Sequence, residues 1–230
     1  MNGPESHCIA GKQTALYGDP AARCRFLQPV DESDLRGMAE EAEAVRRLAP
    51  GIPFCIAAFS VEDWNRELTP WEALPAFGKT PFGSGARETL SFAESRLIPE
   101  LERLHPSGQA AKYALCGYSL AGLFALWGVY SSDRFSGAAA ASPSVWYPDW
   151  ISFAASRPAP AVPVYLSLGD REEKTRNPVM ARVGDCIREQ YRLLSEAGGD
   201  CALEWNPGNH FMDSALRTAK GIAWLLRKAE

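Results

Sequence analysis

Several features are scarce or absent in this chain of 230 residues. No apolar stretch approaches the ~20 residues that a bilayer-spanning helix needs, and the N-terminal segment lacks the basic and apolar regions of a secretory signal. No run rich in lysine or arginine occurs, and the net charge is −4, which argues against a nucleic-acid surface. The sequence therefore predicts a cytoplasmic protein that binds neither nucleic acid nor membrane.

Close pairs of metal-binding or disulfide-forming residues are also lacking. The six cysteines are scattered, and several lie within apolar strand-like patterns, which is typical of reduced, buried thiols. The only histidines are His7, His105 and His210, and their spacing offers no paired zinc ligands. We therefore expect no metal and no other cofactor.

What is present is the composition of a globular domain, with 46% apolar and 23% charged residues, and we expect one domain over residues 1–230. Short apolar strands alternate with amphipathic helical patterns, which is typical of βαβ units and a mostly parallel sheet. Strands are expected at 24–30, 53–59, 113–116, 136–142, 162–168 and 201–205, and helices at 33–48, 87–104, 120–130, 179–197 and from about 212. The sequence is compatible with a homodimer.

The most informative segment is CGYSLAG, residues 116–122. It predicts a strand, a sharp turn and a helix, with Ser119 on the turn, and this is the geometry of a nucleophile elbow. Small residues must flank the serine; Gly117 and Ala121 meet that need, and Gly122 follows one position later than the usual glycine. Cys116 lies on the strand, three residues before the turn, where core packing is the better interpretation.

A serine on such a turn needs a base to activate it. His7 lies in a polar N-terminal segment and His105 directly precedes Pro106 in a turn. His210 follows the strand at 201–205 in the loop NPGNH, which is where the chain order serine, acid, histidine puts the base. A hydrogen-bonded structural or surface imidazole is the alternative interpretation of His210.

The acid should follow an intervening strand, and the loop GDREEKTRNP after residues 162–168 carries three carboxylates. Glu172 is the expected acid, with Asp170 as the close alternative and Glu173 as the third candidate. One of them would hold the imidazole of His210 in the correct tautomer. The alternative is that the whole loop is a solvated charge cluster.

An oxyanion hole needs two backbone donors. One should be the N–H of Leu120, directly after the serine, and the other should come from the loop two strands earlier, at Asp31 or Glu32. An acidic side chain would repel a developing oxyanion, so those carboxylates could instead cap the following helix.

A long segment, 60–86, connects a strand to its helix and is rich in tryptophan, proline and glycine. Long connections of this kind in compact domains often have a function, such as covering an active site. At the carboxyl ends of the strands it would lie over the serine. Trp64, Arg66, Trp71 and Phe82 would then line a substrate pocket, together with Trp146 and Tyr147 of the segment SPSVWYPDW. The alternative is that the aromatic rings only hold the loop against the domain.

Seven segments carry a resemblance to a known family: QPVDESD, DWNRELTPW, FGSGA, GYSLAGLFALW, SPSVWYPDW, YLSLGDREEKTRNPVM and EWNPGNHF. The chain from about Arg23 resembles the small α/β-hydrolase esterases of the putative-esterase family, which includes enterochelin-type siderophore esterases and the esterase D group. The resemblance implies an α/β-hydrolase fold without a large separate cap domain. It puts the nucleophile on Ser119 and the base on His210, while some siderophore esterases rely chiefly on the serine and the histidine.

These features predict a serine hydrolase that cleaves a small-molecule carboxylic ester through an acyl-enzyme. A thioesterase or acyltransferase would use the same residues. A catalytically silent hydrolase-fold protein that binds a small molecule through its aromatic rim is an alternative from a different class.

Overall fold

The computed structural model describes residues 4–76 and 78–229, so positions 1–3, 77 and 230 of the expected domain lie outside the described residues. Within this part of the chain, eight strands form one sheet in the order β1-β2-β4-β3-β5-β6-β7-β8. The strands are β1 (Glu5–Ile9), β2 (Lys12–Gly18), β3 (Cys24–Val30), β4 (Phe54–Ser60), β5 (Lys112–Tyr118), β6 (Ala138–Ala141), β7 (Val164–Gly169) and β8 (Cys201–Asn206). β2 is antiparallel to its neighbours β1 and β4, and the remaining pairs are parallel.

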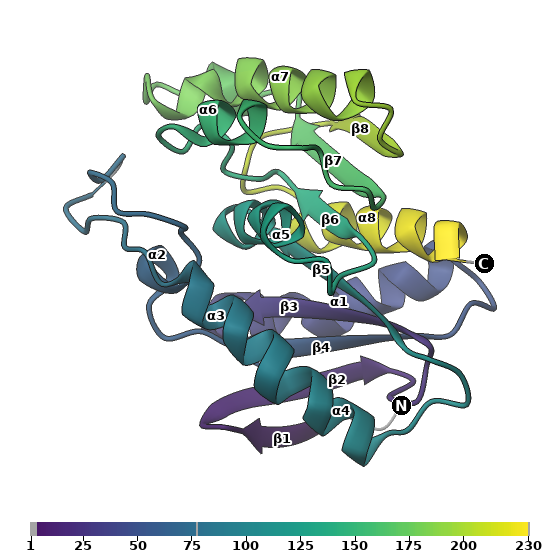
Figure 1. The fold of residues 1–230 in the computed structure, drawn as a ribbon. Helices are drawn as coiled ribbons and strands as arrows, with labels where there is room; N and C mark the ends of the chain where they lie inside the picture. Colours follow the sequence, from purple (N-terminus) through teal and green to yellow (C-terminus); the bar gives the residue numbers. More distant parts are fainter. Residues whose placement is uncertain (1–3, 77, 230) are drawn as a thin grey trace.

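Helices cover both faces of this sheet (Figure 1). They are α1 (Glu32–Leu48), α2 (Trp64–Glu67), α3 (Ala86–Phe92), α4 (Ile98–Leu104), α5 (Leu120–Ser131), α6 (Trp150–Ala155), α7 (Val183–Glu196) and α8 (Ser214–Ala229). A π-helical turn, Ala93–Leu97, joins α3 to α4, and short 3₁₀ turns span Glu172–Lys174 and Met180–Arg182. The predicted mostly parallel sheet flanked by helices is confirmed, and no separate cap domain stands over the described part of the chain.

Alternate strand residues face two separate hydrophobic layers, as the period of two in a strand requires. On one face, α1 and α8 pack together over Phe26, Ile56 and Ala139. On the other face, α3 to α7 cover a second set of strand residues that includes Leu27, Ala57 and Leu115. This three-layer arrangement explains why the inner strands are apolar on both faces.

The N-terminal hairpin was missed by the sequence analysis, which assigned no strand before residue 24. β1 and β2 are joined by Ala10 and Gly11, both with positive φ, 46° and 88°. Two successive residues of this kind make the turn whose twist suits a two-residue hairpin. The overlooked signal is the alternation in β2, where Thr14 and Leu16 are buried and their neighbours are partly exposed. None of the helices in residues 4–76 and 78–229 is both long and apolar enough to cross a membrane.

Candidate active site

The sharp turn after β5 carries Ser119 in a strained backbone conformation, with φ 59° and ψ −121°. A non-glycine residue with positive φ costs on the order of 1–3 kcal/mol and is kept where the surroundings enforce it. Gly117 permits the close approach of α5 at this turn, because a Cβ there would lie 2.5 Å from Cβ of Ala121. Gly122 lets α5 pass the next strand, because its own Cβ would lie 3.1 Å from the carbonyl oxygen of Ala141.

Three side chains meet at the carboxyl ends of β5, β7 and β8. His210 Nε2 lies 3.1 Å from Ser119 Oγ, and His210 Nδ1 lies 2.6 Å from Glu172 Oε2. With its proton on Nδ1, the imidazole donates to Glu172 and accepts from the serine hydroxyl. The structure thus brings together Ser119, His210 and the first-choice acid.

Glu172 is buried and its second oxygen is fully hydrogen-bonded. Oε1 accepts from the Gly169 N–H at 2.8 Å and from the Ser142 hydroxyl at 2.7 Å, and it pairs with Arg217 Nη1 at 2.9 Å. Burial by itself would raise the pKa of Glu172, but hydrogen bonds and charge, led by those of His210, outweigh it and hold the pKa below its ordinary value. The carboxyl group is therefore ionised at neutral pH.

The other two candidate acids contact groups other than His210. Asp170 Oδ1 accepts from the Gly208 N–H at 2.8 Å, so this carboxylate holds the backbone of the histidine loop. Glu173 forms an ion pair with Arg188 at 2.9 Å on the surface of α7. Only Glu172 of the three contacts the imidazole of His210.

Arg217 is a residue of the site that sequence reasoning missed. Its side chain comes from α8 and is 1% exposed. Besides Glu172, it donates to the carbonyl oxygens of Pro207 at 2.9 Å and Asn209 at 3.1 Å, which flank the loop carrying His210. A buried guanidinium thus fixes both the acid and the histidine loop, and a lone arginine in a helical pattern carries no sequence signal for this.

Tyr118 supports the same loop from the strand side. Its hydroxyl donates to the carbonyl oxygen of His210 at 2.9 Å and accepts from Arg217 Nη1 at 3.0 Å. Burial, followed by the charge of Glu172, raises the pKa of Tyr118 to about 12, so the hydroxyl remains a donor at neutral pH.

The expected oxyanion donors differ in their surroundings. Leu120 is the first residue of α5, and the first N–H groups of a helix have no acceptor within the helix. Asp31 instead caps α1: its carboxylate accepts from Ser33 and Asp34 N–H at 2.7 and 2.8 Å. Its own N–H donates to Asp34 Oδ2 at 3.4 Å, so in this structure that N–H is engaged in a capping box rather than free for an oxyanion. Glu32 is the first residue of the same helix.

A cavity of about 450 Å³ lies against His210 and Glu172. Apolar side chains from three segments line it, among them Trp146, Met180 and Phe211. Three cationic residues line it as well, Arg171, Lys174 and Arg176, and none of them has an ion-pair partner within the described residues. This cavity combines apolar walls with positive charge next to His210, which contacts Ser119.

Of the residues expected to bind substrate, Trp146 alone is among those lining this cavity. The two aromatic segments do converge, but they pack on each other: Trp71 Nε1 donates to Pro148 O at 3.0 Å, and the Tyr147 hydroxyl donates to Trp71 O at 2.5 Å. Phe82 packs against Trp146 in a tilted arrangement and against Tyr147 edge-on, with ring centroids 6.0 and 5.2 Å away.

Trp64 and Arg66, which were also expected to bind substrate, lie apart from the cavity as well. Trp64 packs against the hydrophobic core. Arg66 lines a separate hollow with Asp63 and Glu72, and that hollow includes neither Ser119 nor His210. Trp64, Trp71 and Phe82, in the described part of segment 60–86, thus pack against the rest of the fold, as the alternative interpretation expects.

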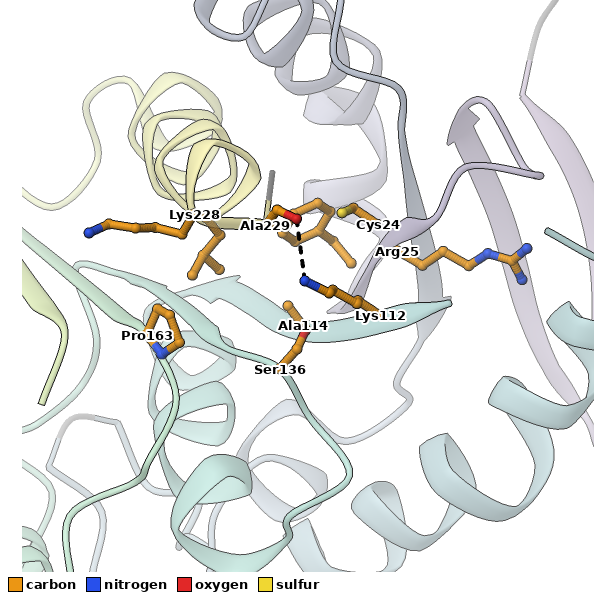
Figure 2. Close-up of a pocket in the computed structure, with 10 residues that line it drawn as sticks. Cys24, Arg25, Lys112, Ala114, Ser136, Pro163, Lys228 and Ala229 are labelled. Carbon is orange, nitrogen blue, oxygen red and sulfur yellow. Dashed lines mark hydrogen bonds between the residues drawn. The ribbon is translucent and has the colours of Figure 1, made fainter. Parts of the chain in front are cut away.

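A smaller hollow of about 140 Å³ lies at the opposite, amino ends of the strands (Figure 2). In this view Arg25 and Lys228 point away from its centre, and Lys112 Nζ donates to Ala229 O at 3.3 Å. Its lining includes neither Ser119 nor His210, unlike the contacts at the carboxyl ends.

Comparison with known proteins bears on this geometry. Residues 44–196, about two thirds of the chain, match the family described as putative esterase. The chain belongs to this family. The family match confirms the predicted resemblance and the prediction of an esterase that acts on small-molecule carboxylic esters. Among curated proteins, none matches the sequence.

Solved structures share the fold of this esterase. The IroE-like serine hydrolase of Shewanella oneidensis superposes with a TM-score of 0.79 at 16% identity, over 99% of this chain and 81% of that one. For the siderophore hydrolase EstA of Aspergillus nidulans the TM-score is 0.71 at 22% identity, over 98% and 95%. The enterobactin esterase FES of Shigella flexneri gives 0.70 at 15%, over 99% of this chain and 60% of that one. At identities this low, the superpositions show a common α/β-hydrolase fold and nothing more.

Proposed function

We propose that this esterase cleaves its substrate through an acyl-enzyme formed on Ser119, with His210 as general base and acid and Glu172 as the acid that orients the imidazole. The observation that carries the proposal is the continuous path of contacts from Ser119 Oγ to His210 Nε2, 3.1 Å, and from His210 Nδ1 to Glu172 Oε2, 2.6 Å. Such a path matches the roles that nucleophile, base and orienting acid need.

In the first half-reaction, Ser119 Oγ attacks the ester carbonyl carbon while His210 Nε2 takes the hydroxyl proton. The tetrahedral intermediate puts negative charge on the former carbonyl oxygen, and the N–H of Leu120 is the donor we assign to it. When the intermediate collapses, the bond to the alcohol oxygen breaks and His210 returns the proton to that oxygen. Water then attacks the acyl-enzyme by the same route and releases the acid.

Glu172 stabilises the imidazolium that forms in both steps. Its depressed pKa keeps it ionised, and the negative charge lies directly on the Nδ1 side of His210. The ion pair with Arg217 and the Ser142 hydroxyl hold the carboxylate in position. We propose that Asp170 contributes only by holding Gly208, and that Glu173 has no catalytic role.

For the substrate, we propose an ester that carries an aromatic group and a negative charge. The cavity beside His210 offers Trp146 and Phe211 to an aromatic ring, and Arg171, Lys174 and Arg176 to an anion. Siderophore and enterobactin hydrolases share the fold, and one of them was solved in the presence of 2,3-di-hydroxy-N-benzoyl-glycine, an aromatic carboxylic acid. A siderophore-type ester is therefore the first class of substrate to test.

The catalytic assignment is tested by single replacements. Ser119→Ala and His210→Ala should each remove nearly all ester hydrolysis, and the double mutant should lose little more, because the members of a triad act as a unit. Ser119→Ala should also abolish labelling by a fluorophosphonate, whereas a catalytically silent protein would never be labelled. Activity of His210→Ala within about tenfold of the wild type would mean that the base lies elsewhere.

The acid is tested with three amides. Glu172→Gln should lower kcat clearly more than Asp170→Asn, and Glu173→Gln serves as the matched control because its ion pair with Arg188 lies at the surface. Equal, small losses in all three variants would indicate that serine and histidine act without an acid.

The substrate is tested with a panel of p-nitrophenyl esters, acyl thioesters and a catecholate siderophore. Removing the charges of Arg171, Lys174 and Arg176 by glutamine should lower kcat/KM for anionic esters and leave neutral esters unchanged. Arg47→Gln, on the exposed last turn of α1, is the control for net charge. Faster turnover of thioesters than of any ester would favour the thioesterase alternative.

A further inference from the structure

Three side chains with metal-binding atoms converge at the edge of the sheet, away from the candidate active site. Glu5 and His7 lie two residues apart on the edge strand β1, so they share one face of that strand. His105 follows the last residue of α4. Figure 1 shows the start of β1 beside the end of α4. His7 Nε2 lies 2.8 Å and His105 Nε2 lies 3.1 Å from the same oxygen, Glu5 Oε1.

The backbone holds His105 firmly in this place. Its N–H donates to Leu101 O at 3.0 Å, and its carbonyl oxygen accepts from the guanidinium of Arg25, which is itself fully buried. His7 is fixed by its pairing with Thr14 in the hairpin. The two imidazoles are therefore presented by ordered backbone rather than by loop ends.

A second observation concerns the ring nitrogen of His105. Its Nε2 is buried and has no hydrogen-bond partner among the described residues, although Glu5 Oε1 is only 3.1 Å away. A buried polar atom without a partner is costly, and a bound cation would supply a partner for this nitrogen.

We propose that Glu5, His7 and His105 bind one transition-metal ion, of which Zn²⁺ is the best match. All three ligand atoms lie within 4.8 Å of one another. Zn²⁺ binds imidazole nitrogen at about 2.0–2.1 Å and carboxylate oxygen at about 2.0–2.2 Å, so neighbouring ligand atoms in a tetrahedron are about 3.3 Å apart. The two nitrogen-to-oxygen distances are already near that value.

The donor set decides the class of metal. Two imidazoles and one carboxylate suit Zn²⁺ and its neighbours, whereas Ca²⁺ and Mg²⁺ prefer sites made of oxygen. Glu5 is partly exposed, which leaves room for water at the fourth position. The spacing of the histidines in the sequence predicts no zinc site, but the fold brings two of them to one carboxylate.

Such an ion would fasten β1 to the end of α4. β1 pairs with β2 on one side only, because it is the edge of the sheet, and edge strands are prone to fraying and to pairing with other chains. A metal bridge to α4 would hold the strand on its other side. None of the three ligands lines the cavity beside His210, so the bridge acts on stability rather than on the ester.

The test is direct metal binding to the full chain, stripped with a chelator and then titrated calorimetrically with Zn²⁺ or Co²⁺. We expect one equivalent to bind, visible Co²⁺ absorption bands of tetrahedral type, and a Tm raised by about 5–10 °C when Zn²⁺ is about 100 times its Kd. His7→Ala and Glu5→Gln should each weaken binding at least about tenfold and remove most of the Tm increase. Mg²⁺ should produce neither effect.

Two control variants separate this site from other ligands of the chain. His210→Ala removes the remaining histidine, and Cys8→Ser removes the exposed thiol next to His7; both should bind Zn²⁺ as the wild type does. His105→Ala should behave like His7→Ala, and because these two lie on different elements, a folding defect in one leaves the other informative. No Zn²⁺ binding by the wild type at about 100 µM metal, or unchanged affinity in the His7 and Glu5 variants, would overturn the proposal and leave only the contacts of the two histidines with Glu5.

Discussion

Replacing Arg217 by methionine should damage both the stability of the esterase and its catalysis. The guanidinium is 1% exposed and pairs with Glu172 Oε1 at 2.9 Å. Methionine keeps much of the volume and removes the charge and all the donors. Glu172 would then be a buried carboxylate without its cation, and breaking a buried pair from one side costs about 3–5 kcal/mol of unfolding free energy.

The catalytic effect should follow from the loss of position. Arg217 also donates to the carbonyl oxygens of Pro207 and Asn209, so the variant frees the backbone on both sides of His210. Displacements of about 1 Å at a catalytic group lower rates by roughly 10–100-fold. We expect a fall of that size in kcat with little change in KM, because Arg217 does not line the cavity beside His210.

Urea unfolding and steady-state kinetics on a p-nitrophenyl ester measure both effects. Arg227→Met is the matched control, since Arg227 lies on the same helix, is exposed, and donates within the described residues only to Leu48 O. In a double-mutant cycle with Glu172→Gln, the part of the kcat loss that Arg217→Met causes through the acid should disappear, and the part that it causes through the loop of His210 should remain. A variant that unfolds within about 1 kcal/mol of wild type and keeps its kcat would refute this reasoning.

Three further predictions follow from buried groups. Burial raises the pKa of Glu41 to about 8. The free energy of unfolding should therefore fall by about 1.4 kcal/mol per pH unit as pH rises from the ordinary glutamate pKa to about 8. Denaturation at several pH values should show that Glu41→Gln removes this slope. Gly117→Ala should cost about 1–3 kcal/mol by crowding α5, whereas Gly37→Ala in the open face of α1 should stabilise slightly in the same urea assay. Trp146→Ala should shift selectivity between aromatic and short-chain esters by about 1–3 kcal/mol, while Trp71→Ala should lower Tm and leave relative rates unchanged. A lower Tm without a change in selectivity for Trp146→Ala, and a change in selectivity for Trp71→Ala, would contradict this assignment.

Much of the fold could be predicted because its signals are local. The strand at 24–30 and the helix at 33–48 are confirmed almost to the residue as β3 and α1, since apolar period and capping residues are short-range properties. The hairpin before residue 24 was missed because β1 is mostly exposed and carries little apolar pattern. The predicted helix at 87–104 is interrupted by a π-helical turn at Ala93–Leu97, just before Pro99, which has no N–H to donate within the helix.

The sequence by itself determined the elbow at Ser119 and the order in which an acid and a histidine follow it, because these depend on which residues end each strand. Only the tertiary structure decided which of three neighbouring carboxylates contacts His210, since Asp170, Glu172 and Glu173 differ in direction rather than in chemistry. Packing of α8 against the sheet likewise brings Arg217 to that acid. Contacts between residues distant in sequence are the reason, because no local pattern encodes where two elements meet.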